Sequence, residues 1–375
     1  MKAMNARRRC VLVGALSVLL LVGACAGPLN TGGAGASDEC GTKPILDQVA
    51  GMDAQARTAR LEELAADEDK SISMYSSLGA DELSGVLDAF ADRYGVSVET
   101  FSANSEEVLQ RLGSEQQAGR TQGDLVENNG TELQLASREG LLSPISSPYA
   151  DPLPAEVRFP TWVGTRYNIF TVMRNTSIVS DADAPRSYLD LADPKYDGLI
   201  GVEAGNWDLF ATIVKYLQQN EGMSEEQAVA VWRDITDGAK VYTSNTPLAD
   251  AVEQGELGLN ISYNHYYSRF IERGSKVLAW EPAIEPQVLR PNGVGIPCHA
   301  PNPATAVLLF DFFISEDGQR ILGVVGNRDV TNPNVPLGLL HGKDLARVYV
   351  DLDKTISESE HWVPIYDELM RNATA

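Results

Sequence analysis

From residue 71 onward, short apolar runs alternate with amphipathic segments of helical periodicity. The run "SISMYSS" (71–77) is followed by "ADELSGVLDAFADRYG", whose apolar residues recur at the spacing of one helix face: Leu83, Val86, Leu87 and Phe90. Two more strand–helix pairs follow before residue 140. Strands that alternate with helices predict an α/β fold, in which crossover helices connect a mostly parallel sheet.

The length of the chain predicts two lobes. It has 375 residues, which is more than one hydrophobic core usually serves. A proline-rich stretch precedes one extended passage at 161–175, and a second extended passage lies at 288–297. Two such crossovers between lobes would make a hinge. We therefore expect lobe 1 to contain residues 43–160 and 292–375, and lobe 2 to contain residues 161–291.

The first residues predict export from the cytoplasm. Basic residues precede an uncharged apolar run, Val11–Val22, and small residues follow it. This order is typical of a signal peptide, here 1–24, and the run is too short to span a bilayer, which needs about 20 residues. The pattern "LVGAC" resembles the lipobox of bacterial lipoproteins, which implies acylation of Cys25 and a flexible tether over 25–42. An ordinary secretory peptide with a chance cysteine is the alternative.

These features predict a protein of the cell envelope, outside the cytoplasm, that contacts the membrane through its N-terminal lipid alone. The formal charge is −22 for the whole chain and −26 without the signal peptide, which holds four basic and no acidic residues. Nucleic acid is a poor partner for such a surface, because phosphate binding depends on clustered Lys and Arg.

The four cysteines predict one disulfide. Cys10 lies within the predicted signal peptide and Cys25 would carry lipid. Cys40 and Cys298 then remain as a pair in an oxidising compartment, where a disulfide is favoured. Two unpaired thiols are the alternative.

Several segments, taken in order, resemble a known family. They are "ISMYSS" (72–77), "YLDLADPKYDGLIGV" (188–202), "VYTSNTPLADAVEQGEL" (241–257), "NHYY" (264–267) and "FDFFISEDGQRIL" (310–322). Together they resemble the bacterial extracellular solute-binding proteins of the ferric-iron type, which are partners of ABC importers. The resemblance covers roughly residues 70 to 340 and rests on the shared order of segments that are individually weak.

The resemblance implies a two-lobed periplasmic-binding-protein fold of type II, often called a Venus flytrap. Such a protein closes around a solute and delivers it to a permease in the membrane. Ferric iron is the first expectation for the solute, as a transported ligand and not as a cofactor. A small organic solute, namely a phosphonate, a phosphorylated compound or a cationic cofactor, is the alternative. A monomer is expected.

In the ferric-binding family an adjacent tyrosine pair supplies phenolate ligands, and the matching positions here are Tyr266 and Tyr267. Fe(III) is a hard cation that favours oxygen anions. A free phenol has a pKa of about 10, so the charge of the metal must favour the phenolate. Consecutive residues of a regular helix point about 100° apart, and the alternative is that one tyrosine faces the core and the other faces solvent.

The first lobe departs from the family pattern. Relatives often offer a histidine after the first strand, and Gly79 stands near that position here. They also offer a carboxylate after the third strand, where this chain has Asn129, with Glu127 two residues earlier. Both usual ligands of the first lobe are therefore missing, which weakens the expectation of iron.

Other polar residues are expected at the cleft because they follow predicted strands, and ligands bind at the carboxyl ends of parallel strands. These candidates are Ser76, Ser77, Asn128, Asn129, Asn245, Thr246 and Asn264. A further helix start contributes Asn206, Trp207 and Asp208; Asp208 argues against a tightly held phosphate there. Ordinary turn and cap roles are the alternative for each. Arg166 could pair with an anionic ligand or form a structural ion pair.

An enzyme is not expected. The sequence has no G-x-S-x-G elbow, no H-E-x-x-H pair and no glycine-rich phosphate loop, and its acidic residues show no pattern that selects a catalytic pair. We predict no catalytic residue, although a secreted hydrolase is the competing class of protein.

Overall fold

The computed structural model describes residues 40–324 and 327–373. The predicted signal peptide, Cys25 and nearly all of the predicted tether lie outside these residues. Within the described part, no helix combines the length and the apolar character needed to cross a membrane.

The N-terminal half of the sheet is parallel. Strand β1 (Ser71–Ser76) lies between β2 (Ser97–Ser102) and β3 (Leu125–Asn129) and runs parallel to both. The connections are the helices α3 (Ala80–Tyr94) and α4 (Ser105–Gln117), and α5 (Gly130–Arg138) follows β3. Local sequence defines these helices: Gly95 ends α3 with a positive φ of 68°, and the side chain of Asn104 caps α4 by accepting from the amide of Glu107.

A second group of strands repeats the arrangement. Strand β5 (Ile200–Glu203) pairs in parallel with β6 (Lys240–Tyr242) and β7 (Leu259–Tyr263). The helices of this group are α6 (Trp207–Asn220), α7 (Glu225–Thr236), α8 (Asn245–Glu253) and α9 (Asn264–Glu272).

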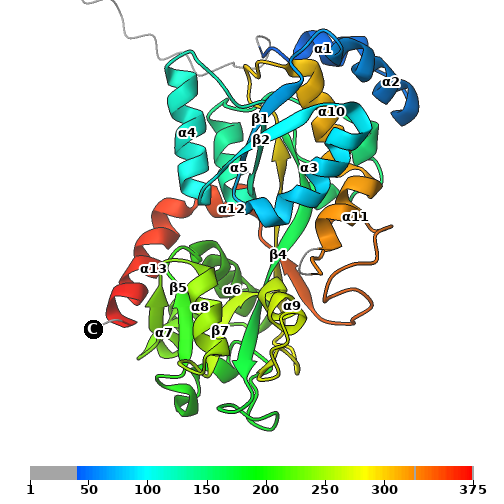
Figure 1. Cartoon of the computed structure of the whole chain (residues 1–375). Coiled ribbons are helices and arrows are strands. Elements are labelled where there is room, and N and C mark those ends of the chain that lie inside the picture. Colours follow the sequence, from blue (N-terminus) through cyan, green and yellow to red (C-terminus); the bar gives the residue numbers. More distant parts are fainter. Residues whose placement is uncertain (1–39, 325–326, 374–375) are drawn as a thin grey trace, which may run out of the picture. The chain divides into compact units, whose positions relative to one another are not determined.

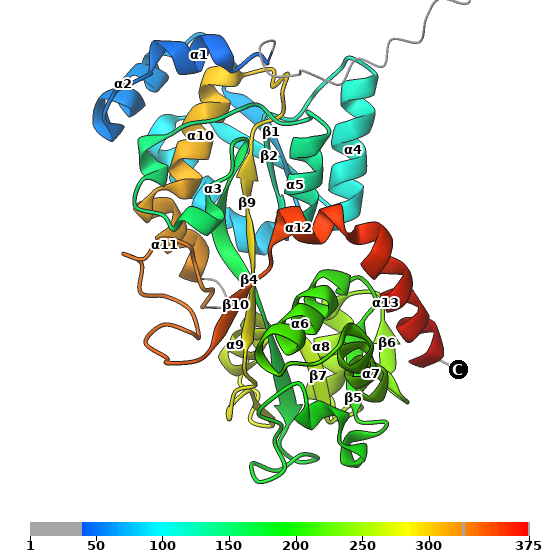
Figure 2. The same cartoon turned by 180° about the vertical axis from the view of Figure 1, so that it is seen from behind.

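Two long antiparallel strands connect the groups: β4 (Trp162–Asn175) and β9 (Gln287–Gly295). Strand β9 pairs with β3, and β4 pairs with β7, so one sheet has the order β2-β1-β3-β9-β4-β7-β5-β6. Figures 1 and 2 show both strands running from one group of elements to the other. These strands coincide with the two predicted crossovers. Their opposite directions make the centre of the sheet antiparallel, whereas the alternation of strands and helices in the sequence predicts a mostly parallel sheet.

A third connection follows near the C-terminus. Strand β10 (Arg347–Tyr349) pairs with β9, and α12 (Leu352–Ser357) and α13 (Ser359–Ala373) come after it. Helix α13 packs against α6 and α7 of the second group (Figure 2), although the sequence analysis places residues 292–375 in lobe 1. The reason is an apolar face: Trp362 and Tyr366 of α13 contact the ring of Phe210 on α6.

The N-terminal segment is attached to the first group of elements. Helix α1 (Lys43–Gln48) precedes α2 (Ala54–Ala65), and α2 packs on the almost fully buried helix α10 (Pro303–Ile314). Arg57 and Asp311 form a buried ion pair of 2.6 Å between α2 and α10. The predicted disulfide between Cys40 and Cys298 is present. The remaining elements are β8 (Leu278–Ala279), α11 (Glu316–Val324) and the 3-10 turns Pro148–Ala150, Ala155–Val157, Asp190–Ala192 and Pro194–Tyr196.

Candidate functional site

A cavity of about 880 Å³ lies where the two groups of strands face each other across β4 and β9. Its walls come from the segments that follow the carboxyl ends of β1, β2, β3, β5, β6 and β7. Arg166 and Asn168 of β4 and Arg290 of β9 also line it. This is the edge of an α/β sheet at which ligands generally bind.

About half of the residues proposed from sequence line this cavity. Those that do are Ser77, Asn129, Asn206, Asn245, Thr246 and Tyr266. The others are absent from its walls: Ser76, Asn128, Trp207, Asp208, Asn264 and Tyr267.

The residues outside the cavity walls have structural contacts instead. Asn264 donates to Asp329 at 2.8 Å, and the side chain of Asn128 donates to the carbonyl of Ser105 at 3.0 Å. Trp207 packs against a hydrophobic core cluster. Strand-end and helix-start residues thus divide between the cavity and the core according to the direction of each side chain.

The tyrosine pair separates in the way that a regular helix requires. Because α9 begins at Asn264, Tyr266 and Tyr267 occupy consecutive helical positions. Tyr266 lines the cavity, and its hydroxyl lies 3.0 Å from that of Thr246. Tyr267 packs against two hydrophobic clusters.

The second phenol in the cavity belongs to Tyr263, the last residue of β7. Its ring is nearly parallel to that of Tyr266, at 14°, with 6.3 Å between the ring centroids. Sequence reasoning missed Tyr263 as a site residue. The available signal was its position at a strand end, three residues before Tyr266.

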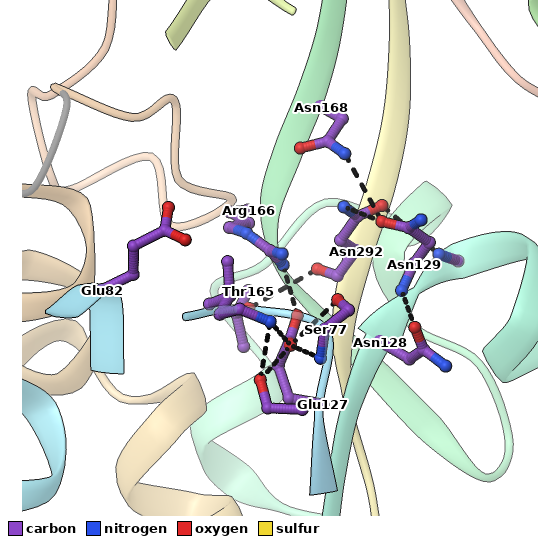
Figure 3. Close-up of polar contacts among 12 residues, drawn as sticks. Ser77, Glu82, Glu127, Asn128, Asn129, Thr165, Arg166, Asn168 and Asn292 are labelled. Carbon is purple, nitrogen blue, oxygen red and sulfur yellow. Dashed lines mark hydrogen bonds and ion pairs between the residues drawn. The ribbon is translucent and has the colours of Figure 1, made fainter. Parts of the chain in front are cut away.

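Glu127 accepts hydrogen bonds from the end of β1 and from the loop that follows it. Its Oε2 accepts from the hydroxyl of Ser76 at 2.6 Å and from the amide of Ser77 at 3.0 Å. Its Oε1 forms an ion pair of 2.7 Å with Nη1 of Arg166, and both side chains are buried. Figure 3 shows Glu127 between Ser77 and Arg166. Arg166 therefore forms the structural ion pair that was one of its two expected roles.

Three asparagines join the strands beneath the cavity. Oδ1 of Asn129 accepts from Nδ2 of Asn292 at 2.9 Å and from Nδ2 of Asn168 at 3.4 Å. Its own amide nitrogen donates to the hydroxyl of Ser105 at 2.6 Å. In Figure 3 the amide nitrogen of Asn168 points toward Asn129 and its amide oxygen points away. This network links β3, β4 and β9 at the floor of the cavity.

One end of the cavity, between α5 and α6, centres on Arg290. The guanidinium donates to Oδ2 of Asp208 at 2.9 Å and to the hydroxyl of Tyr263 at 2.6 Å. Two further carboxyls line this end, Glu132 in the first turn of α5 and Glu203 at the end of β5. Burial raises the pKa of each to about 7, although Arg290 opposes the shift.

The raised pKa of Glu132 predicts a pH-dependent stability. The folded chain keeps this proton up to about pH 7, whereas the unfolded chain releases it near pH 4.5. The free energy of unfolding should therefore fall, by about 1.4 kcal/mol per pH unit, as the pH rises through this window. Glu132→Gln stays neutral and should lack this contribution. Urea unfolding between pH 5 and pH 8 measures it, with the exposed Glu107→Gln as the control; an unchanged pH slope in Glu132→Gln would contradict the expectation.

The other end of the cavity carries arginines. Arg328 forms an ion pair with Glu82, and Arg269 lies 3.9 Å from both Asp81 and Glu82. Burial opposes ionisation of Glu82, but Arg328, the amide of Gly79, Arg166 and Arg269 together outweigh it and hold the pKa of this carboxyl below its usual value. Burial and the arginine charges hold the pKa of His265 well below its usual range, so its ring is neutral. Sequence reasoning missed Arg269, Arg290 and Arg328.

A preformed metal site is not evident in the part of the chain that the structure describes. There, no three His, Cys, Asp or Glu side chains come together in a way that could hold a metal ion. The oxygen atoms of residues that line the cavity include the phenols of Tyr263 and Tyr266.

The family follows from a comparison with known proteins. A family model described as bacterial extracellular solute-binding protein matches residues 85–338. This is well over half of the chain, and the protein belongs to that family. Members are extracellular solute-binding proteins, so the predicted class of protein is confirmed.

Individual relatives cover most of the chain. Iron uptake protein A1 of Synechocystis sp. is 26% identical over 271 residues, which are 68% of this chain and 74% of its own. The major ferric iron-binding protein of Neisseria meningitidis serogroup A is 24% identical over 313 residues, with 77% of this chain and 90% of its own covered.

A solved structure supports the fold. The periplasmic binding protein AfuA of Actinobacillus pleuropneumoniae, with fructose-6-phosphate bound, superposes with a TM-score of 0.69 at 19% identity. The match covers 81% of this chain and 99% of AfuA. The predicted two-lobed periplasmic-binding-protein fold is thereby confirmed.

Proposed function

We propose that this protein captures ferric iron between its lobes and delivers it to the membrane permease of an ABC importer. The observation that carries the proposal is the pair of phenols, Tyr263 and Tyr266, on one wall of the cavity. Both relatives named above are iron proteins by name. The protein acts outside the cytoplasm as a monomer without catalytic activity, and a lipid on Cys25 holds it at the membrane.

The chemistry of the proposal depends on phenolate oxygens. Burial raises the pKa of Tyr263 and of Tyr266 above the usual value of a phenol, so Fe(III) must displace these protons by its own charge. Arg290, which donates to the hydroxyl of Tyr263, favours the phenolate form. The remaining coordination comes from an oxygen-rich anion, which Arg269 can neutralise. Closure of the lobes about the hinge strands then excludes water.

The position of the phenols predicts which tyrosine variants lose iron. Full-length protein incubated with ferric citrate should show a visible charge-transfer band from phenolate to iron. Tyr266→Phe and Tyr263→Phe should each lose most of this band, because each removes one phenolate ligand. Tyr267→Phe is the matched control and should keep it, because Tyr267 lies against the core. Absorbance spectra of the four proteins measure the effect; loss of the band in Tyr267→Phe would contradict this ligand set.

A second candidate is capture of a phosphorylated organic solute without iron. The observation in its favour is Arg269, whose ion pairs among the described residues are two long contacts of 3.9 Å, to Asp81 and Glu82. The bound fructose-6-phosphate of AfuA is consistent with it. In the same experiment, a colourless protein that ferric citrate does not stabilise thermally, but that gains stability with glucose 6-phosphate, would select this candidate.

A further inference from the structure

The cavity end between α5 and α6 has polar atoms that the protein itself leaves without partners. Among the described residues, Oε2 of Glu132, Oδ1 of Asn168 and Nε of Arg290 are buried and make no hydrogen bond. All three residues line the cavity. Asn168 and Arg290 are 5% and 4% exposed, so solvent does not readily satisfy them.

These atoms are held in place by the contacts of their neighbours. Asn168 and Arg290 stand opposite each other in the register of β4 and β9. The amide nitrogen of Asn168 donates to Asn129, which leaves its oxygen directed away from the asparagine network (Figure 3). The terminal nitrogens of Arg290 donate to Asp208 and Tyr263. The unpaired oxygen of Asn168 therefore cannot be satisfied by a rotation of its amide without loss of the hydrogen bond to Asn129.

Within the described part of the chain, this end offers no unpaired cation to an anion, because Asp208 already pairs with Arg290. Glu132 and Asp208 lie in the first turns of α5 and α6, where a helix N-terminus would otherwise attract an anionic ligand. Asp208 already neutralises Arg290, and Glu132 and Glu203 add two further carboxyls. A buried acceptor without a partner destabilises the protein, and a group that donates a hydrogen bond would satisfy it.

We propose that the end of the cavity formed by Glu132, Asn168 and Glu203 is a subsite for a hydrogen-bond-donor group of an organic solute. The donor is a hydroxyl or a protonated amine. The anionic part of the same solute faces Arg269 and Arg328 at the other end of the cavity. The cargo is then an organic anion that carries a donor group, either alone or as the chelator of iron. This inference rests on one part of the proposed function, namely that the solute binds in this cavity.

The test compares matched solutes by titration calorimetry with the full-length protein. Citrate and propane-1,2,3-tricarboxylate differ only by a hydroxyl, and glucosamine 6-phosphate and 2-deoxyglucose 6-phosphate differ only by an amine. We expect the member with the additional donor group in at least one pair, citrate or glucosamine 6-phosphate, to bind about tenfold more tightly than its partner. The subsite is rejected if the two members of each pair bind equally tightly, or if none of the four solutes binds.

Variants of Glu132 identify the donor. Glu132→Leu should abolish the preference within the pair, because it removes the acceptor. Glu132→Gln keeps an acceptor oxygen but cannot ionise beside a protonated amine, so it should lose the preference for an amine and keep most of that for a hydroxyl. It also serves as the reference if the leucine variant does not fold. The same substitutions at Glu107, an exposed residue of α4, should change nothing.

The outcomes separate this inference from the proposed function. An iron charge-transfer band together with no preference in either pair would leave iron capture standing and overturn the subsite. A preference that Glu132→Leu removes, in a protein that develops no colour with iron, would support the subsite and overturn iron as the cargo. A preference that survives in both Glu132 variants would place the donor elsewhere and reject the subsite.

Discussion

Glu127→Ala is expected to lower the free energy of unfolding by about 3–5 kcal/mol, because it leaves Arg166 buried without its partner. Arg166 is 2% exposed and its ion pair with Glu127 is 2.7 Å long. The same substitution removes the acceptor of Ser76, Ser77 and Leu78. The loop after β1 and the hinge strand β4 thus lose Glu127, a side chain that contacts both. Urea unfolding followed by circular dichroism measures the change.

Two controls isolate the buried charge. Glu99→Ala replaces an exposed glutamate on the neighbouring strand β2 and should change stability by no more than about 0.5 kcal/mol. The double variant Glu127→Leu with Arg166→Met replaces the pair by apolar side chains and should recover most of the loss. A double variant as unstable as Glu127→Ala would contradict the view that an unpaired charge is the cause.

Replacing both Cys40 and Cys298 by serine is expected to lower the free energy of unfolding by about 2–5 kcal/mol. The disulfide joins residues separated by 258 positions, so its loss frees a very long loop in the unfolded chain. In the folded protein it holds the segment that leads into α1, together with a hydrogen bond of 2.8 Å from the amide of Gly41 to the carbonyl of Cys298. Urea unfolding of the double variant measures the loss.

Hydrogen exchange can show which part of the protein loses stability when the disulfide is removed. Amide hydrogen exchange should accelerate in α1 more than in α2, because the Arg57–Asp311 ion pair still attaches α2 to α10. Cys10→Ser, in the predicted signal peptide, is the matched control and should leave stability unchanged. Equal stability of the double variant and wild type would show that the disulfide contributes nothing to the native fold.

The local pattern of apolar and polar residues predicts many of the strands and helices of the fold. The alternation that begins at "SISMYSS" predicts β1, α3 and the strand–helix pairs that follow, because periodicity of apolar residues reports which face of an element is buried. The extended passages at 161–175 and 288–297 correspond to β4 and β9. The family resemblance predicts the class of protein, which the comparison confirms.

Local pattern failed where side-chain direction decides the outcome. Tyr266 and Tyr267 are the same residue type at adjacent positions. Because α9 starts at Asn264, only Tyr266 lines the cavity. The position of α13 in the chain, after the second crossover, predicts that it belongs to lobe 1, but its aromatic residues pack on α6 and α7. Helical periodicity indicates that two adjacent tyrosines diverge, but it describes one element at a time and does not show which tyrosine enters the cavity or which helices α13 packs on.

The sequence by itself determined the elements, the two crossovers, the pairing of Cys40 with Cys298 as the first expectation, and the family. Only the tertiary structure decided the composition of the cavity. Arg269, Arg290 and Arg328 come from α9, β9 and the segment after α11, and Glu132 and Glu203 come from different strand groups. Residues so distant in sequence share no local signal. Their charges act on one another only after the chain folds around the hinge strands, which brings them to a common cavity.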